Sequence, residues 1–507
     1  MKADKQTLLR QHRQRKRFAL LLALIALIAL ALAGLAWLLP LLALLGWVLN
    51  EAFFSDHLFY SPSQDYRYDL HAAVRLPVQL ANGRLHLNAP IEPDVDTWLL
   101  AIQVRGSWFS RWRDPLVRIY TADSQGTPNQ QTQDARSDQQ TFERGSFGLR
   151  YLNLSDFRAE LAAGQLQLSG LHCTFEQDAV LYGFRNADYR RKRTLILAPH
   201  ADDAELAAFG FYQSSAETSI VTVTVGELEA DAYQAFGLAP AQAAELKARL
   251  RVWDSQAIPQ WAGIPAERCF QLGYFCLQLR AMQQAPEQSF GSRVAPLQDV
   301  RPFRRRNSQR LPADANGEPT WRNLVADLRA LLETLQPEVV ITPHPVIDPH
   351  SDHVACTAAL NEAIQLSQWQ PQYQLHYANH LHDNDRWPMG NAHDGVTLPP
   401  AVAALPVSGL WSLSLDRRQQ IDKAMALAMM HDLQPRLPLK KRLRRLLQRG
   451  LAGRRWPAFG DSEFFRKAVR RHELFFVQPA TGTAETGTAA TETTAIAATT
   501  AAESGAV

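Results

Sequence analysis

The feature that most constrains this chain is an apolar run near its N-terminus. No charged residue occurs from residue 18 to residue 50, where Leu, Ala and Ile dominate. About 20 apolar residues span a bilayer as a helix, so residues 18–39 suffice, with Pro40 ending or kinking that helix. A cleaved signal peptide would have an apolar region of about 7–15 residues and a small-residue cleavage site, which residues 41–50 do not offer. The run therefore predicts an uncleaved transmembrane anchor over residues 18–50.

The charges on either side of the run predict its orientation. Seven Lys and Arg residues lie before residue 18, whereas four acidic residues and only one basic residue lie between 51 and 69. Basic flanks stay in the cytoplasm, so residues 1–17 are expected to be a basic cytoplasmic terminus. The rest of the chain is then expected across the membrane, which in a bacterium is the periplasm. We expect a single-pass protein of the bacterial inner membrane.

The remaining composition excludes several classes of protein. The 507-residue chain carries 53 Lys and Arg against 50 Asp and Glu, a net charge of +3, so no nucleic-acid partner is expected. Hydrophobic residues make up 46% of the chain, which excludes a wholly disordered or fibrous protein. Four cysteines exclude a disulfide scaffold. Residues 478–507 are mostly Thr, Ala, Glu and Gly, and this tail is predicted to be disordered.

Residues 60–185 have the pattern of a β-rich accessory domain. Short strand-like runs at 74–80 and 84–88 flank the pair Asn82-Gly83, which is typical of a tight hairpin. The polar insert at 123–140 is predicted to be a long exposed loop. Many short strands at this spacing predict a β-sandwich. The further strand-like runs are 97–104, 116–121, 148–154, 165–168 and 179–184.

From residue 192 onward, strand-like and helix-like patterns alternate. This alternation predicts a Rossmann-like, mostly parallel α/β sheet with helices on both faces, over residues 192–477. In such sheets the functional site lies beyond the carboxyl ends of the strands. The predicted strands are 194–198, 219–225 and 339–342, and the predicted helices are 240–256, 321–335 and 351–365.

Two polar clusters follow two of these predicted strands. His200, Asp202 and Asp203 come directly after strand 194–198, and His350 and His353 follow strand 339–342. A catalytic zinc takes three ligands from His, Asp and Glu and leaves a position for water, and such a set also suits ferrous iron. Either cluster alone would fit a helix cap or an ordinary surface histidine pair. Together, at the ends of parallel strands, they predict a metal site.

These clusters resemble the signatures of the PIG-L/LmbE-like family of zinc-dependent N-acetylglucosaminyl deacetylases. His200-Ala201-Asp202-Asp203-Ala204 is similar to the family's His-Pro-Asp-Asp-Glu, and His350-Ser351-Asp352-His353 to its His-x-Asp-His. Gly226-Glu227 resembles a further family motif. The resemblance covers about residues 192–475. Two positions depart from it, since Ala201 replaces Pro and Ala204 replaces Glu, with Glu205 one place later.

The resemblance implies a role for each matching residue. His200, Asp203 and His353 would bind the metal, which would be Zn²⁺, with Fe²⁺ as the alternative. Asp202 would be the general base, and His350 would stabilise the oxyanion or protonate the leaving amine. Arg251 would contact the substrate. Asp348 and Asp352 are expected to orient the histidines.

Several other residues are left with open roles. Pocket-lining and structural roles remain alternatives for His344, His380, His382 and His431. Cys269 and Cys276 are candidates for a disulfide in an oxidising periplasm. Residues 438–456 are basic and partly amphipathic, for which a solvated surface helix is favoured over contact with anionic headgroups or an acidic glycan.

The function that these features imply is a membrane-anchored, metal-dependent deacetylase. Its substrate would be an N-acetylated amino sugar in a glycan or glycolipid of the cell envelope. Two alternatives stay open: a metal-dependent hydrolase of another amide or ester, and a non-catalytic glycan-binding envelope protein.

Overall fold

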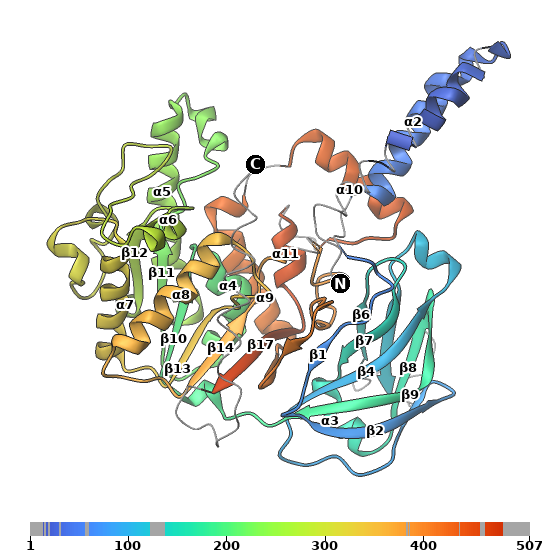
Figure 1. The fold of residues 1–507 in the computed structure, drawn as a ribbon, viewed down its shortest axis with the longest axis horizontal. Helices are drawn as coiled ribbons and strands as arrows, with labels where there is room; N and C mark the ends of the chain where they lie inside the picture. The colour runs from blue at the N-terminus through green and yellow to red at the C-terminus, as the bar shows by residue number, and fades with distance from the viewer. Residues whose placement is uncertain are drawn as a thin grey trace.

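The computed structural model describes residues 14, 17–18, 21–29, 32–55, 60–121, 137–381, 384, 386–434, 437–456 and 462–479. It has two lobes, an α/β lobe and a strand-rich lobe, and the N-terminal helix α2 (Leu39–Leu49) extends away from both (Figure 1). The α/β lobe contains the clusters that the sequence singled out.

The α/β lobe is built on a seven-stranded sheet of order β12-β11-β10-β13-β14-β17-β16. The first five strands are parallel, and β17 and β16 extend the sheet in the antiparallel direction. The predicted mixed α/β fold is therefore confirmed, with an antiparallel edge that the sequence did not predict. The strands are β10 (Thr194–Ala198), β11 (Thr218–Thr224), β12 (Cys269–Tyr274), β13 (Val339–Pro343), β14 (Tyr373–Tyr377), β16 (Leu410–Ser414) and β17 (His472–Pro479).

Helices cover both faces of this sheet because each strand is buried on both sides. One face packs against α4 and α9, and the other against α6, α7 and α8. Helix α7 shows why these residues form a helix, since its leucines recur on one face and Thr320 caps its N-terminus by accepting from the Asn323 N–H. The helices are α4 (Asp203–Ser214), α5 (Pro240–Ala257), α6 (Leu279–Gln284), α7 (Trp321–Leu335), α8 (Ser351–Leu366), α9 (Arg417–Met429), α10 (Leu439–Leu451) and α11 (Glu463–Ala468).

The strand-rich lobe is one antiparallel sheet of order β6-β5-β8-β3-β2-β9-β4-β7. The predicted sandwich of two sheets is not found as such, because hydrogen bonds join all eight strands in a single ladder around one apolar core. The hairpin at Asn82-Gly83 forms as predicted, with both residues at positive φ. The strands are β2 (Val74–Ala81), β3 (Arg84–Leu87), β4 (Thr97–Gly106), β5 (Leu116–Thr121), β6 (Ser137–Thr141), β7 (Phe147–Asn153), β8 (Leu166–Leu171) and β9 (Cys173–Phe184).

The two lobes share a buried apolar contact. Leu99 and Phe184 of the strand-rich lobe pack in one cluster with Leu398, Leu410 and Phe476 of the α/β lobe. Strand β1 (Tyr68–Asp69) also pairs in parallel with β15 (Leu405–Pro406). The lobes therefore fold against each other rather than standing apart on a linker.

The N-terminal apolar run differs from the prediction. Gly34 adopts a positive φ of 75°, a short 3-10 helix follows at Ala36–Leu38, and α2 (Leu39–Leu49) begins there. Pro40 lies in the first turn of α2, where its missing N–H costs nothing, so the prediction that it ends or kinks a helix over 18–39 is wrong. Every helix in the described part of the chain is too short or too polar to cross a membrane. Residues 19–20 and 30–31 of the run lie outside the described residues.

The first two residues of the predicted disordered tail belong instead to β17. Gln478 still pairs with Gln374, and Pro479 with Tyr373, at the end of β17. Residues 480–507 of the predicted disordered tail, and residues 122–136 of the predicted loop, lie outside the described residues.

Candidate active site

The two polar clusters meet at the centre of the parallel sheet. Strands β10 and β13 are neighbours, with β11 and β12 on one side and β14 on the other, so the chain changes its winding direction between them. The loops that follow β10 and β13 therefore lead to helices on opposite faces of the sheet, and α/β sheets form their sites between two such loops. One loop leads into α4 at Asp203, and the other into α8 at Ser351. The carboxylates of both loops thus lie near positive helix N-termini.

Three candidate ligand atoms form a compact triangle. His200 Nδ1 lies 3.1 Å from Asp203 Oδ2, which lies 3.1 Å from His353 Nε2, and the two nitrogens are 3.3 Å apart. Zinc binds such atoms at about 2.0–2.1 Å in tetrahedral geometry, which separates the ligand atoms by about 3.3 Å. The three side chains therefore have the donor types and the spacing that a tetrahedral divalent metal requires.

Further groups orient these side chains. Asp348 Oδ2 is 2.9 Å from His353 Nδ1, on the ring edge opposite the triangle, and Asp352 Oδ2 is 3.3 Å from His200 Nε2. Asp348 is itself bound by the backbone N–H groups of residues 379 and 380. Asn379 donates to Asp203 Oδ1 at 2.8 Å, leaving Oδ2 for the triangle. A carboxylate behind each histidine fixes which ring nitrogen faces the metal position.

The histidines and aspartates of the cluster shift one another's pKa values. Burial alone lowers the pKa of His353, but Asp203 and Asp348 raise it to about 9. Burial raises the pKa of Asp203, yet His353 and His200 hold it well below its usual range. The pKa of His350 falls to about 4 through burial and the neighbouring His353 and His200. Ligands bind a metal in their deprotonated forms, so a bound metal would replace these shared protons.

Asp202 lies beside the triangle on a separate ion pair. Arg251 Nη2 donates to Asp202 Oδ1 at 2.9 Å, and Arg251 Nη1 donates to Asp432 Oδ2 at 3.1 Å. The Arg251 side chain is only 4% exposed. Gly226 makes this possible, because a Cβ there would stand 2.6 Å from Arg251 Nε. The structure thus shows Arg251 locking Asp202 in place.

Two histidines complete the cluster. His350 offers a ring nitrogen within 4.8 Å of ligand atoms of His200 and His353, and His380 does so for Asp203 and His353. The two rings stack with centroids 5.4 Å apart. His350 Nδ1 is shielded from solvent and has no hydrogen-bond partner among the described residues, which leaves it for a ligand of the site.

The structure places some of the remaining candidate residues outside the site and one of them next to it. His344 accepts from backbone N–H groups of its own loop, and His431 pairs with Asp254 at 2.6 Å, so both serve local structure. His382 lies outside the described residues. Cys269 and Cys276 are both free thiols, and Cys276 lies close to His200 and Asp352.

Two residues of the cluster, Asn379 and Cys276, were missed by sequence reasoning. Asn379 follows β14, the parallel strand next to β13, and so occupies the same edge of the sheet as the two predicted loops. The short run at 373–377 that forms β14 was the available signal, but it was not among the predicted strands. All the clustered side chains come from the α/β lobe, between residues 200 and 380.

Comparison with known proteins bears on the part of the chain that carries the cluster. Residues 195–364 match the PIG-L family, described as GlcNAc-PI de-N-acetylase, which confirms the predicted resemblance over this segment. No curated protein matches.

Two solved structures are similar at low levels. One is N,N'-diacetylchitobiose deacetylase from Pyrococcus horikoshii, with 13% identity, 57% of this chain and 84% of that chain covered, and a TM-score of 0.31. The other is the 4-carboxy-2-hydroxymuconate hydratase GalB from Pseudomonas putida, with 13% identity, 59% and 100% coverage, and a TM-score of 0.30.

Proposed function

Because residues 195–364 match the PIG-L family, we propose that this protein is a metal-dependent deacetylase. Its substrate is the N-acetyl group of an amino sugar in a glycan or glycolipid of the cell envelope. The observation that carries the proposal is the triangle of His200 Nδ1, Asp203 Oδ2 and His353 Nε2, with sides of 3.1–3.3 Å. Amide hydrolysis needs a polarised carbonyl, an activated water and a proton for the amine.

The proposed metal is zinc, with ferrous iron as the alternative that the same ligands suit. A divalent ion on these ligands polarises the amide carbonyl and lowers the pKa of water. His200, Asp203 and His353 hold it, and Asp348 and Asp352 orient the two histidines through their second ring nitrogens.

The proton transfers fall to the residues around the ligands. Asp202 accepts a proton from the attacking water, and Arg251 fixes its carboxylate through the hydrogen bond to Oδ1. His350 uses its free Nδ1 to hydrogen-bond the carbonyl oxygen or the leaving amine. Direct contact between Arg251 and the substrate stays a prediction, and in the proposed mechanism Arg251 acts through Asp202.

We further propose that the protein works at the bacterial inner membrane, attached through its N-terminal apolar helix, with the catalytic lobe in the periplasm. The basic residues before residue 18 and the acidic residues after residue 50 support this orientation. Protease added to spheroplasts should then digest the region after residue 50. Full protection of that region would place it in the cytoplasm.

Acetate release tests the proposed reaction. The full-length protein is incubated with N-acetylglucosamine oligomers, N-acetylglucosaminyl lipids and peptidoglycan fragments, before and after treatment with a chelator and readdition of Zn²⁺ or Fe²⁺. Release that the chelator abolishes and one metal restores supports the proposal. O-acetyl esters and N-acetylated peptides serve as controls for a different hydrolase. No release from any sugar by metal-loaded protein would contradict it.

A further inference from the structure

Helix α10 (Leu439–Leu451) presents its polar side to the protein. Arg444 Nε contacts Glu51 Oε2 at 2.5 Å, and Gln448 Nε2 donates to Ser55 Oγ at 3.0 Å. Gln448 is the buried residue of this helix. Both contacts are with the segment directly after α2, so α10 lies at the base of the N-terminal apolar helix (Figure 1).

The apolar side of α10 faces outward. Leu439, Leu443 and Leu446 recur at helical spacing on the side opposite Gln448, and Leu439 and Leu446 are 71% and 66% exposed. A helix on a solvated surface normally turns its apolar stripe toward the core. In α10 the apolar stripe faces outward instead, so its burial requires an apolar partner.

The charges that flank this stripe are all positive. The helix sequence LKKRLRRLLQRGL contains six Lys and Arg residues and no acidic residue. Lys440, Arg442 and Arg449 are exposed along the edges of the stripe. A second copy of the chain docked on the same face would bring these cations together, which disfavours self-association there. An anionic bilayer supplies both the apolar depth and the opposite charge.

A second exposed apolar element lies next to α10. The turn Trp108–Arg111 of the strand-rich lobe leaves Trp108 and Phe109 63% and 61% exposed. The turn is joined to α10 because Arg113 Nη2 donates to the Leu451 carbonyl at 3.3 Å. Aromatic side chains of this kind are typical of the membrane interface. Helix α2, whose leucines are also exposed, leads into residues 50–55. This segment contacts α10 through Glu51 and Ser55, and its Phe53 ring lies 5.5 Å from that of Trp112, next to the turn.

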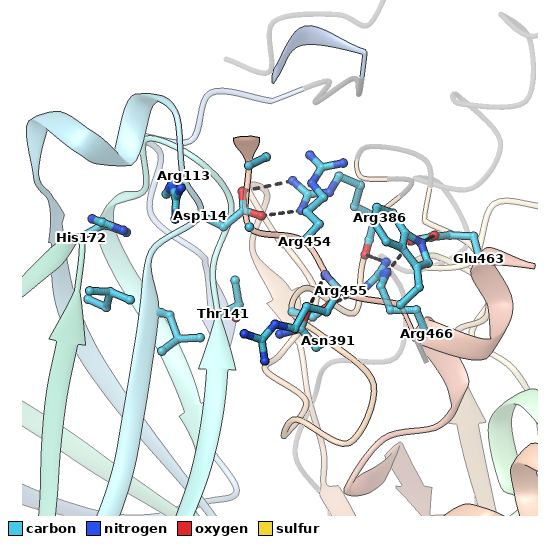
Figure 2. A pocket seen from close by; sticks show the side chains of 16 residues that line it. Arg113, Asp114, Thr141, His172, Arg386, Asn391, Arg454, Arg455, Glu463 and Arg466 are labelled. Carbon is cyan, nitrogen blue, oxygen red and sulfur yellow. Dashed lines mark hydrogen bonds and ion pairs between the residues drawn. The ribbon is translucent and has the colours of Figure 1, made fainter. Parts of the chain in front are cut away.

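A cationic pocket opens where α10 and this turn end (Figure 2). Together with the solvent space at its open mouth, it has an empty volume of about 670 Å³. Arg386 is paired with Asp114 and Arg466 with Glu463 on its wall, while Arg455 is exposed. The charged side chains that line it are Arg113, Asp114, Arg386, Arg454, Arg455, Glu463 and Arg466. Five guanidinium groups against two carboxylates favour an anion such as a phosphate.

We propose that the stripe of Leu439, Leu443 and Leu446, together with Trp108 and Phe109, rests on an anionic phospholipid bilayer, and that the pocket of Figure 2 receives a headgroup phosphate. This surface seats the α/β lobe against the membrane independently of its catalytic chemistry. Each exposed basic residue near such a surface contributes about 1 kcal/mol, about fivefold in affinity. The apolar stripe then adds the burial of its leucines.

Spin labels on the full-length protein in vesicles test this seating. All four native cysteines are buried, so Leu446→Cys is labelled selectively, and Ile421→Cys on α9, also exposed, is the matched control. In phosphatidylglycerol-containing vesicles the label at 446 should collide with oxygen rather than with a water-soluble nickel chelate, and the label at 421 should do the reverse. In phosphatidylcholine vesicles the label at 446 should shift toward the aqueous pattern.

Two further outcomes decide the proposal. Arg455→Gln should raise the phosphatidylglycerol content needed for half of the lipid signal at 446, because it removes one headgroup contact. A label at 446 that stays aqueous in anionic vesicles would overturn the proposal. A label at 446 that is protected equally without lipid, and exposed on dilution, would instead show contact between copies of the chain and would overturn it too.

Discussion

Asp156 provides a quantitative test of how the two lobes are joined. It lies in the strand-rich lobe, and its carboxylate meets His472 Nε2 at 3.1 Å and Arg471 Nε at 3.3 Å in the α/β lobe. Ser414 also donates to it. Burial raises the pKa of Asp156, but His472, Ser414 and Arg471 outweigh this effect and lower the pKa to about 2.

The size of the effect follows from the difference between the folded pKa of about 2 and the usual aspartate pKa of 3.8. At about 1.36 kcal/mol per pKa unit, the ionised carboxylate contributes about 2.5 kcal/mol to stability. Because the folded pKa is the lower one, this contribution is present above about pH 4 and is lost as the pH falls through 2. Asp156→Asn should remove it.

Urea unfolding in detergent, followed by tryptophan fluorescence, measures the difference between wild type and Asp156→Asn. It should be about 2.5 kcal/mol at pH 5 and about half of that at pH 3, since the wild-type carboxylate is then partly protonated in the unfolded state. Asp178→Asn, at an exposed position of the same lobe, should show no such dependence. An equal loss at both pH values would refute the assigned ion cluster.

Three further substitutions probe the site and its supports. Asp348→Asn should weaken metal affinity about 10–100-fold by releasing the His353 ring, as measured by competition with a chelating dye. Gly226→Ala should lower kcat and the melting temperature, because φ is +69° and the new Cβ would press on Arg251; unchanged kinetics would count against the role of Arg251. Glu205→Gln should stabilise the protein by about 3 kcal/mol at pH 7 and should not stabilise it below pH 4. Burial raises the pKa of Glu205 to about 8, so folding opposes the ionisation of this carboxyl at pH 7. Calorimetry at both pH values checks this.

Local patterns predicted three of the five parallel strands, β10, β11 and β13, whereas β12 and β14 were not predicted. The run at 194–198 is continuous, apolar and bounded by polar residues, and it forms β10 with those ends. Strand β6 (Ser137–Thr141) was instead placed in a polar loop, because its sequence SDQQT carries no hydrophobic periodicity. Gln140 is buried there through hydrogen bonds to Asp138 and to the backbone of Asn153. A strand that is buried through polar hydrogen bonds cannot be predicted from the spacing of hydrophobic residues.

In the site, too, local sequence patterns predicted some features, whereas contacts between distant segments could not be predicted. The two polar clusters were predicted to form a metal site because both follow parallel strands, and the ligand set His200, Asp203 and His353 was implied by the family resemblance. The structure shows that these two strands are neighbours. The pairing of Arg251 with Asp202 and Asp432 joins three segments distant in sequence, and no local pattern encodes it. The reversed face of α10 depends likewise on its contact with Glu51, nearly 400 residues earlier in the chain.

The metal content of two variants, substituted at adjacent positions, tests most directly the claim that Asp203 binds a metal and Asp202 acts as the base. Asp203→Asn and Asp202→Asn make the same chemical change one residue apart, and elemental mass spectrometry with acetate release reads both. Asp203→Asn should lose the bound metal, since two histidines alone hold a divalent ion poorly, whereas Asp202→Asn should keep it and lose about 10²–10⁴-fold in turnover. Full metal content in Asp203→Asn, or a stripped metal in Asp202→Asn, would contradict the site.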